Sequence, residues 1–308
     1  MYKQIIETSE LLDKANITGE KVMEFLEKRG AKNLNVKKIR KRDKSKSTDF
    51  ISITIPGSKG LLVGGKAPSL GIIGRLGGIG AQPEKIGLVS DADGAVVSIA
   101  CALKILEMKN SGNELEGDIS IVTHICPFAR IRSTTLTEFM SSPLESNDMS
   151  KMEKIDNADA ILSIDTTKAN CIINQKGFAI TPTVKEGYIL PVSTDLLRLM
   201  EVVTGRVPLV LSIVTQDITP CSNKLIHINS IMQPSTVTSA PVVGVAITSG
   251  VIVPGASTGS SDLSDLEKAA RFVVEIAKYF GGNKINFYNH LEYSKLVKLY
   301  GSMKHLQK

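Results

Sequence analysis

The chain has 308 residues, of which 42% are hydrophobic and 22% charged, a composition that is typical of a globular protein long enough for one large α/β domain or two small ones. No apolar stretch is long enough to cross a bilayer, and the first residues lack the apolar core and cleavage site of a secretory signal. We therefore expect a cytoplasmic protein without a membrane partner. Its four cysteines lie far apart and form no CxxC pair, which excludes a zinc knuckle and a disulfide framework.

The net charge of +6 is concentrated in residues 37–46, with a second basic cluster near the C-terminus. The first cluster has no aromatic residue between its cations, and the chain contains no tryptophan, so a stacking surface for nucleic acid is not indicated. We expect no nucleic-acid partner. The first cluster is interpreted as a solvated hairpin arm.

The N-terminal region predicts two helices followed by a hairpin. Helical apolar spacing covers residues 3–14 and 18–29, with Thr18 as N-cap of the second helix. Alternating apolar residues then occupy Asn33–Arg40 and Asp49–Ile55, separated by a polar stretch. These two runs predict an antiparallel hairpin on the edge of a sheet.

Strand and helix patterns alternate through the rest of the chain. Strands are predicted at residues 69–74, 85–90, 118–124, 160–165, 208–214 and 241–248, and helices at 94–109, 194–204 and 262–280. This order favours a single α/β domain over residues 1–308, a three-layer αβα arrangement around a mostly parallel, mixed sheet. The polar segment 129–157 is an insertion, either a lid above the sheet or an ordinary surface loop.

Reactive side chains follow one predicted strand after another. Arg75, Asp91, His124 and Asp165 each stand at the end of an apolar run. The carboxyl ends of parallel strands meet at one edge of a sheet, where open α/β folds bind their ligands. The sequence therefore predicts an active site in a crevice at this edge.

Several segments resemble the di-zinc exopeptidases, the superfamily of co-catalytic zinc aminopeptidases and carboxypeptidases. The matching segments, in chain order, are Arg75–Gly80, Ser90–Ala95, Thr123–Pro127, Ala158–Thr166 and Val253–Thr258 with the following helix. The chain resembles still more closely a bacterial family known only as domain of unknown function 1177, over nearly its whole length. The resemblance implies a zinc-exopeptidase-like (phosphorylase/hydrolase-like) fold.

Most metal ligands of that superfamily are substituted here. By the resemblance, Arg75 stands in place of a histidine ligand, Cys126 and Pro127 replace the catalytic glutamates, and Thr258 replaces the last histidine. Asp91 and Asp165 are carboxylates at positions where, by the resemblance, the superfamily also has carboxylate ligands. A complete di-zinc site cannot be assembled from these residues.

A reduced metal site remains a candidate. Asp91, Asp165 and His124 are the predicted ligands of one divalent ion, most readily zinc, with Cys126 as a possible fourth. The alternative is structural: Asp91 caps the helix that follows, His124 is a hydrogen-bonded residue at the core edge, and Asp165 faces a helix N-terminus. Asp93, in the same segment as Asp91, is a further candidate catalytic residue.

Arg75 and Cys126 suggest chemistry without a full metal centre. A fixed guanidinium either clamps a substrate carboxylate or pairs with Asp91 or Asp165. A Cys126 thiolate would be a nucleophile with His124 or His227 as its base, although an isolated cysteine more often serves packing.

Further polar residues lie after later strands. Asp217, His227 and Asn229 are candidate substrate-binding residues, or residues that form turns. The small-residue segment 255–261, which includes Thr258, precedes a helix, so its amides are suited to an anionic group of the substrate. It lacks a complete phosphate-binding loop, so no nucleotide cofactor is expected.

These residues favour a hydrolase-like enzyme that acts on a small peptide, amide or amino-acid derivative with an altered metal site. The alternatives are a non-catalytic ligand-binding or structural relative, and a metal-free hydrolase or isomerase that uses Cys126. The expected partner is a small molecule or short peptide. Because relatives of this fold commonly assemble, we expect a homo-oligomer.

Overall fold

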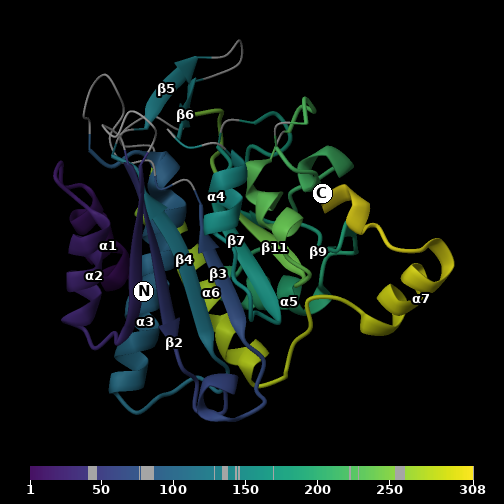
Figure 1. Ribbon diagram of the computed structural model, residues 1–308, viewed down its shortest axis with the longest axis horizontal. Helices are drawn as coiled ribbons and strands as arrows, with labels where there is room; N and C mark the ends of the chain where they lie inside the picture. Colours follow the sequence, from purple (N-terminus) through teal and green to yellow (C-terminus); the bar gives the residue numbers. More distant parts are fainter. Residues whose placement is uncertain are drawn as a thin grey trace.

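A mixed sheet organises the computed structural model of the chain (Figure 1). The structure describes residues 1–40, 47–75, 77, 87–127, 129–133, 138–142, 144, 146–168, 170–221, 223–227, 229–253 and 261–307. Within these residues the strand order is β1-β2-β4-β3-β7-β11-β9-β10, and β8 pairs with β11. Strands β4, β3, β7 and β11 run parallel to one another, while β1, β2 and β8 pair antiparallel, as the sequence predicted for a mostly parallel sheet.

The described strands of the main sheet are β1 (Asn33–Arg40), β2 (Ser47–Ile55), β3 (Leu70–Gly74), β4 (Ile119–Ile125), β7 (Ala160–Thr166), β8 (Gly177–Ile180), β9 (Val184–Lys185), β10 (Tyr188–Ile189) and β11 (Val242–Thr248). A separate hairpin contains β5 (Arg130–Ser133) and β6 (Glu138–Ser141). The described α-helices are α1 (Tyr2–Leu12), α2 (Gly19–Glu27), α3 (Asp93–Asn110), α4 (Ser146–Met152), α5 (Thr194–Thr204), α6 (Leu263–Gly281) and α7 (His290–Tyr300). Short 3₁₀ helices are η1 (Leu61–Val63), η2 (Ser90–Ala92), η3 (Thr215–Ile218), η4 (Ser230–Val237) and η5 (Lys304–Gln307).

The central strands are buried on both faces, and their side chains alternate between two cores. In β7, Ala160, Leu162 and Ile164 pack in the larger core, whereas Ile161 packs in the smaller one. Helices α1, α3, α5 and α6 contribute to the larger core. The smaller core is closed by η3 and η4, and α4 packs against η4. A layer of helical segments therefore covers each face of the sheet, and the predicted three-layer α/β class is confirmed.

The N-terminal predictions hold in detail. Both helices form, and the Thr18 hydroxyl accepts a hydrogen bond from the Lys21 amide at 3.4 Å. The two alternating runs pair as the antiparallel hairpin β1–β2, with β1 at the edge of the sheet. In Figure 1 both helices lie beside this edge, while α7 projects from the opposite side of the molecule.

Two predicted strands are wrong in the part of the chain that is described. Residues 208–214 form one bridge, between Val210 and Ile180, and no strand, because the place beside β11 is taken by β8. Of the predicted strand 85–90, residues 85 and 86 lie outside the described residues. The described remainder ends in η2, whose turn leads directly into α3.

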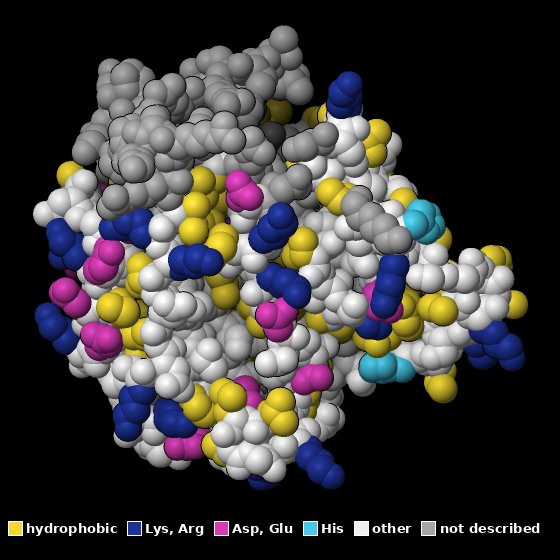
Figure 2. Space-filling view, viewed as in Figure 1, with side chains coloured by type: hydrophobic (Ala, Val, Ile, Leu, Met, Phe, Trp, Pro, Cys, Tyr) yellow, Lys and Arg dark blue, Asp and Glu magenta, His cyan; other side chains and the backbone are white. Residues whose placement is uncertain are grey.

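The surface of the described residues mixes both signs of charge. On the face shown in Figure 2, lysine and arginine side chains are interspersed with aspartate and glutamate. No helix in the described ranges is long and apolar enough to span a membrane.

Candidate active site at the carboxyl ends of the strands

Asp91 and Asp165 meet at the carboxyl ends of the parallel strands, as the sequence predicted. Asp165 is near the end of β7, and Asp91 lies in η2, the turn that precedes α3. The two segments are joined by the Thr166 hydroxyl, which donates a hydrogen bond of 2.6 Å to the Ser90 carbonyl oxygen. Both carboxylates are buried, with exposed fractions of 8% for Asp91 and 1% for Asp165.

The charge of this pair is poorly compensated. Burial raises the pKa of Asp91 well above its ordinary value, and the nearby charges of Asp165 and Asp93 raise it further. Burial also raises the pKa of Asp165 to about 6, although the charge of Arg75 and a hydrogen bond from Ser230 oppose the rise. The Ser230 hydroxyl donates to Asp165 Oδ2 at 2.7 Å, and the Thr166 amide donates to Oδ1 at 2.8 Å. These bonds fix the orientation of the Asp165 carboxylate.

Asp93 has a cation of its own. Its Oδ2 atom lies 2.6 Å from Lys168 Nζ, and Ser261 donates a hydrogen bond to its other oxygen. Both charged side chains are almost completely buried. Burial raises the pKa of Asp93 and the Lys168 ammonium opposes that rise. Lys168 was not among the residues predicted from the sequence.

Arg75 pairs with a carboxylate that the sequence analysis missed. Its Nη1 atom lies 3.5 Å from Glu153 Oε2, and His124 Nδ1 lies 3.4 Å from Glu153 Oε1. Glu153 is fully buried. Although burial raises the pKa of Glu153, the charge of Arg75 and the contacts with His124 outweigh it and hold that pKa below its usual range. Arg75 therefore forms its direct ion pair with Glu153, and the predicted direct pair with Asp91 or Asp165 is not seen.

Four carboxylates of this region (Asp91, Asp93, Glu153 and Asp165) are thus buried with two permanent cations, Arg75 and Lys168. Glu153 is paired with Arg75 and Asp93 with Lys168, which leaves Asp91 and Asp165 as the adjacent, undercompensated pair. A divalent cation between these two would remove their repulsion. Their oxygens are ligands for zinc, manganese and magnesium alike.

His124, the predicted third metal ligand, contacts Phe50 and Glu153. His124 stacks at a tilt on Phe50, with ring centroids 5.4 Å apart, and its Nδ1 atom faces Glu153. Among the residues that the structure describes, no three His, Cys, Asp or Glu side chains group closely enough to hold a metal ion. The set of Asp91, Asp165 and His124 is therefore not assembled as a three-ligand site.

The remaining predicted site residues have structural contacts. Asp217 is buried, and its oxygens accept hydrogen bonds from the amides of Val214 at 2.9 Å and Asn229 at 3.1 Å. His227 Nε2 lies 3.3 Å from the Thr219 hydroxyl. Asn229 Oδ1 is buried without a hydrogen-bond partner in the described ranges. Their predicted role in substrate binding stays a prediction.

Cys126 and Thr258 complete the predicted set. Cys126 follows β4, is 1% exposed, and its amide donates to the Gly77 carbonyl oxygen at 2.9 Å. Thr258 lies outside the described residues.

Close backbone contact positions Asp91 and Asp93. A Cβ atom on Gly94, at the start of α3, would lie 2.5 Å from the Arg75 carbonyl oxygen and 2.6 Å from that of Ile164. A side chain at Gly94 would push α3 away from both β3 and β7.

We therefore expect Gly94→Ala to lower the free energy of unfolding by about 1–3 kcal/mol, because an added methyl group overpacks this contact. Chemical denaturation measures the change. Gly250→Ala is the matched control, since no atom of the described residues, its two chain neighbours aside, lies within 4 Å of its Cβ position. Equal stability of the two variants would contradict the close approach.

The fold defines an α/β protein with a mostly parallel, mixed sheet covered on both faces. The chain belongs to the family described as "Protein of unknown function (DUF1177)", whose model matches residues 39–308. No match was found among curated proteins.

A solved structure shares the fold. The bottromycin maturation enzyme BotP, solved in complex with Mn, is 10% identical with a TM-score of 0.51, and the match covers 90% of this chain and 71% of that chain. Two structures of LapA from Legionella pneumophila, one titled as an aminopeptidase, are each 12% identical with TM-scores of 0.48. These matches cover 90% and 93% of this chain and 71% and 73% of the LapA chains. The match to the family model confirms the family that the sequence resembles, and the likeness to BotP agrees with the α/β fold class.

Proposed function

We propose that the chain is a hydrolase of a small peptide, amide or amino-acid derivative, in which Asp91 and Asp165 hold one divalent cation. The observation that carries the proposal is the adjacency of these two carboxylates at the ligand-binding edge of the sheet, buried and without a full complement of positive charge. Zinc was favoured from the sequence, with Cys126 as its fourth ligand. With carboxylate oxygens as the closest donors, manganese is an equal candidate.

Several residues of the chain have distinct roles at this site. Ser230 and the Thr166 amide hold Asp165 in one orientation, while Lys168 neutralises Asp93. Arg75, held by Glu153, adds positive charge beside Asp165 and is suited to orient a substrate carboxylate. A bound cation supplies polarisation of the substrate carbonyl and a water of lowered pKa.

The metal content of the purified protein tests the proposal. We expect one zinc or manganese ion per chain by elemental analysis, and a loss of at least about 90% of it in Asp91→Asn and in Asp165→Asn, because each variant loses one of two charged ligands. Hydrolysis of aminoacyl amides and dipeptides is expected to fall at least about 100-fold in both variants. Asp148→Asn, an exposed acid of α4, is the control and should keep both properties.

The same measurements separate the alternatives. An ion content independent of Asp91 and Asp165 would contradict the proposed site. Activity that survives both substitutions but is lost in Cys126→Ser would favour the thiol mechanism, although the burial of Cys126 gives that mechanism no support. A metal-loaded protein that hydrolyses no member of the panel would favour a binding function.

A further inference from the structure

A pocket lies at the opposite end of the sheet from Asp91 and Asp165. Its volume is about 890 Å³, within the range of small-molecule sites. Pro68, Asp159 and Pro241, which precede β3, β7 and β11, form part of its wall. Because Asp159 and Asp165 are six residues apart on an extended strand, roughly 20 Å separates the pocket from the candidate active site.

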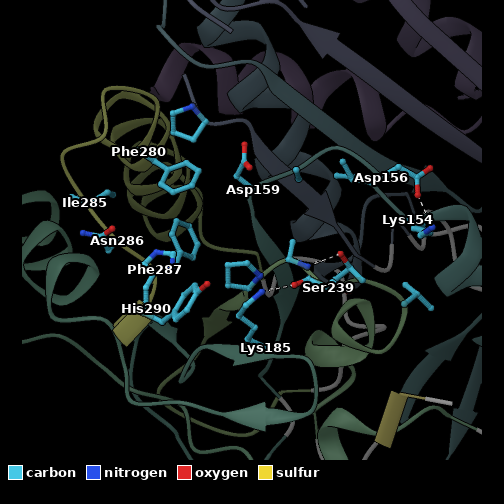
Figure 3. Close-up of a pocket in the computed structure, with 18 of the residues that line it drawn as sticks. Lys154, Asp156, Asp159, Lys185, Ser239, Phe280, Ile285, Asn286, Phe287 and His290 are labelled. Atoms are coloured by element: carbon cyan, nitrogen blue, oxygen red, sulfur yellow. Dashed lines mark hydrogen bonds and ion pairs between the residues drawn. The ribbon is translucent and has the colours of Figure 1, made fainter. Parts of the chain in front are cut away.

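Two aspartates and two lysines are among the residues that line this pocket. Lys154 and Asp156 pair with each other at 2.5 Å, which leaves Asp159 and Lys185 as two opposite charges. In Figure 3 Asp159 and Lys185 approach the cavity from opposite sides. Lys185 Nζ donates to the Ser239 carbonyl oxygen at 2.8 Å and lies 5.6 Å from the centre of the Tyr288 ring. An ammonium group has three donors, so this contact leaves Lys185 with donors for a ligand. The side chain is partly buried, and this burial lowers its pKa.

One carboxylate oxygen of Asp159 accepts hydrogen bonds from Ser69, and the other is available to a ligand. Its Oδ2 atom accepts hydrogen bonds from the Ser69 amide at 2.8 Å and the Ser69 hydroxyl at 3.1 Å. Its Oδ1 atom has no hydrogen-bond partner among the residues that the structure describes. The Ser69 bonds fix the carboxylate, so that Oδ1 is held in place to accept from a ligand.

An aromatic wall closes one side of the cavity. Phe280, from the end of α6, and Phe287, from the segment before α7, pack edge to face with ring centroids 5.1 Å apart. In Figure 3 both rings lie on the same side of the cavity, next to Ile285. This wall offers apolar surface between the two charged groups.

We propose that this pocket binds a zwitterionic ligand, an apolar α-amino acid or a short peptide that carries one. Lys185 binds the ligand carboxylate, Asp159 Oδ1 accepts from the ligand ammonium, and Phe280 and Phe287 contact the apolar side chain. Neither charge alone accounts for the arrangement, since a simple anion would face Asp159 and a simple amine would face Lys185. The proposal is independent of the hydrolase proposal, because the two sites share no residue.

Isothermal titration with L-phenylalanine and with glycyl-L-phenylalanine tests the pocket. We expect saturable binding of at least one of them, with one ligand per chain. Lys185→Met and Asp159→Asn are each expected to raise Kd at least tenfold, while Lys284→Met, which removes a nearby lysine outside the pocket, leaves Kd unchanged. Asparagine at position 159 keeps an acceptor for the Ser69 amide, and circular dichroism verifies that each variant folds.

Two ligand analogues test the two charges separately. 3-Phenylpropionate lacks the ammonium group and phenethylamine lacks the carboxylate, and each is expected to bind at least tenfold more weakly than L-phenylalanine. An analogue that binds as tightly as L-phenylalanine would overturn the zwitterion assignment.

Chelator-treated Asp91→Asn protein distinguishes this pocket from the candidate active site. Binding that persists in this variant supports the pocket between Asp159 and Lys185 even if the hydrolase proposal fails. Binding that disappears there, or the absence of saturable binding up to about 10 mM ligand, which corresponds to less than about 3 kcal/mol of binding free energy, overturns the inference.

Discussion

Replacing Glu153 with glutamine is expected to lower the free energy of unfolding by about 3–5 kcal/mol, because it leaves the guanidinium of Arg75 buried without its direct counter-charge. Glu153 is fully buried, 3.5 Å from Arg75 Nη1 and 3.4 Å from His124 Nδ1. Removal of one partner from a buried pair costs far more than removal of an exposed one. Urea denaturation followed by circular dichroism measures the change.

The matched control is Glu116→Gln. Glu116 pairs with Lys59 at 3.2 Å, but both side chains are largely exposed, so the expected loss is below about 1 kcal/mol. The double variant Arg75→Met with Glu153→Met removes both charges and should recover much of the lost stability. If Glu153→Gln is as stable as the control, Glu153 does not balance the charge of Arg75.

The same variant should also weaken cation binding. Arg75 already lowers the pKa of Asp165, so its charge reaches this carboxylate. Without Glu153, Arg75 is free to pair more closely with Asp165 and to compete with a cation there. An increase in the Kd for manganese in Glu153→Gln, measured by titration calorimetry, would support this link between the two groups of charges.

Local sequence patterns predicted the fold because burial is nearly the same along the length of each central strand and along one face of each covering helix. Each parallel strand is buried on both faces, which requires a short apolar run, and each covering helix requires an apolar stripe. The position of Asp165 followed from strand direction, since it stands near the carboxyl end of β7. Asp91 reaches the same edge through η2 and not, as predicted, at the end of a strand. Thr166 and Ser230, which fix Asp165, carried no comparable signal.

The wrong strand and the site residues that were not predicted depend on contacts between distant segments of the chain. An apolar run forms a strand only where another strand has free backbone groups to pair with it. The place beside β11 is taken by the short strand β8, so residues 208–214 form only one bridge. Glu153 follows α4 within a polar, charged segment, and only its spacing of four residues from Met149 distinguishes it from exposed acids such as Asp148. The spacing of buried Met149 and Glu153, four residues apart, is the one helical signal that places both on the same face of a turn. Lys168 was missed for the same reason, because its partner Asp93 is 75 residues away.

In chelator-treated protein, Asp165→Asn is expected to raise stability at pH 8 by about 3 kcal/mol and to leave it nearly unchanged at pH 4. The folded state has an Asp165 pKa of about 6, above the ordinary value of 3.8 that applies to the unfolded chain. Between these values the folded protein binds more protons, so stability falls as pH rises and the loss is complete above about pH 6. Thermal unfolding at several pH values measures this dependence. The exposed Asp156→Asn variant is the control and should follow the wild-type curve.

A divalent cation should nearly remove the difference at pH 8. Zinc or manganese at about 100 times its Kd is expected to stabilise the wild-type protein by about 2.7 kcal/mol, because the cation binds only the folded state. Asp165→Asn should gain almost nothing, since it has lost one of the two charged ligands. Asp165 would then destabilise the empty protein and be required for the loaded one, the pattern expected of a ligand retained for binding rather than for folding. A wild-type protein whose stability at pH 8 does not respond to either cation, or a variant that responds equally, would show that the pair of carboxylates has another role.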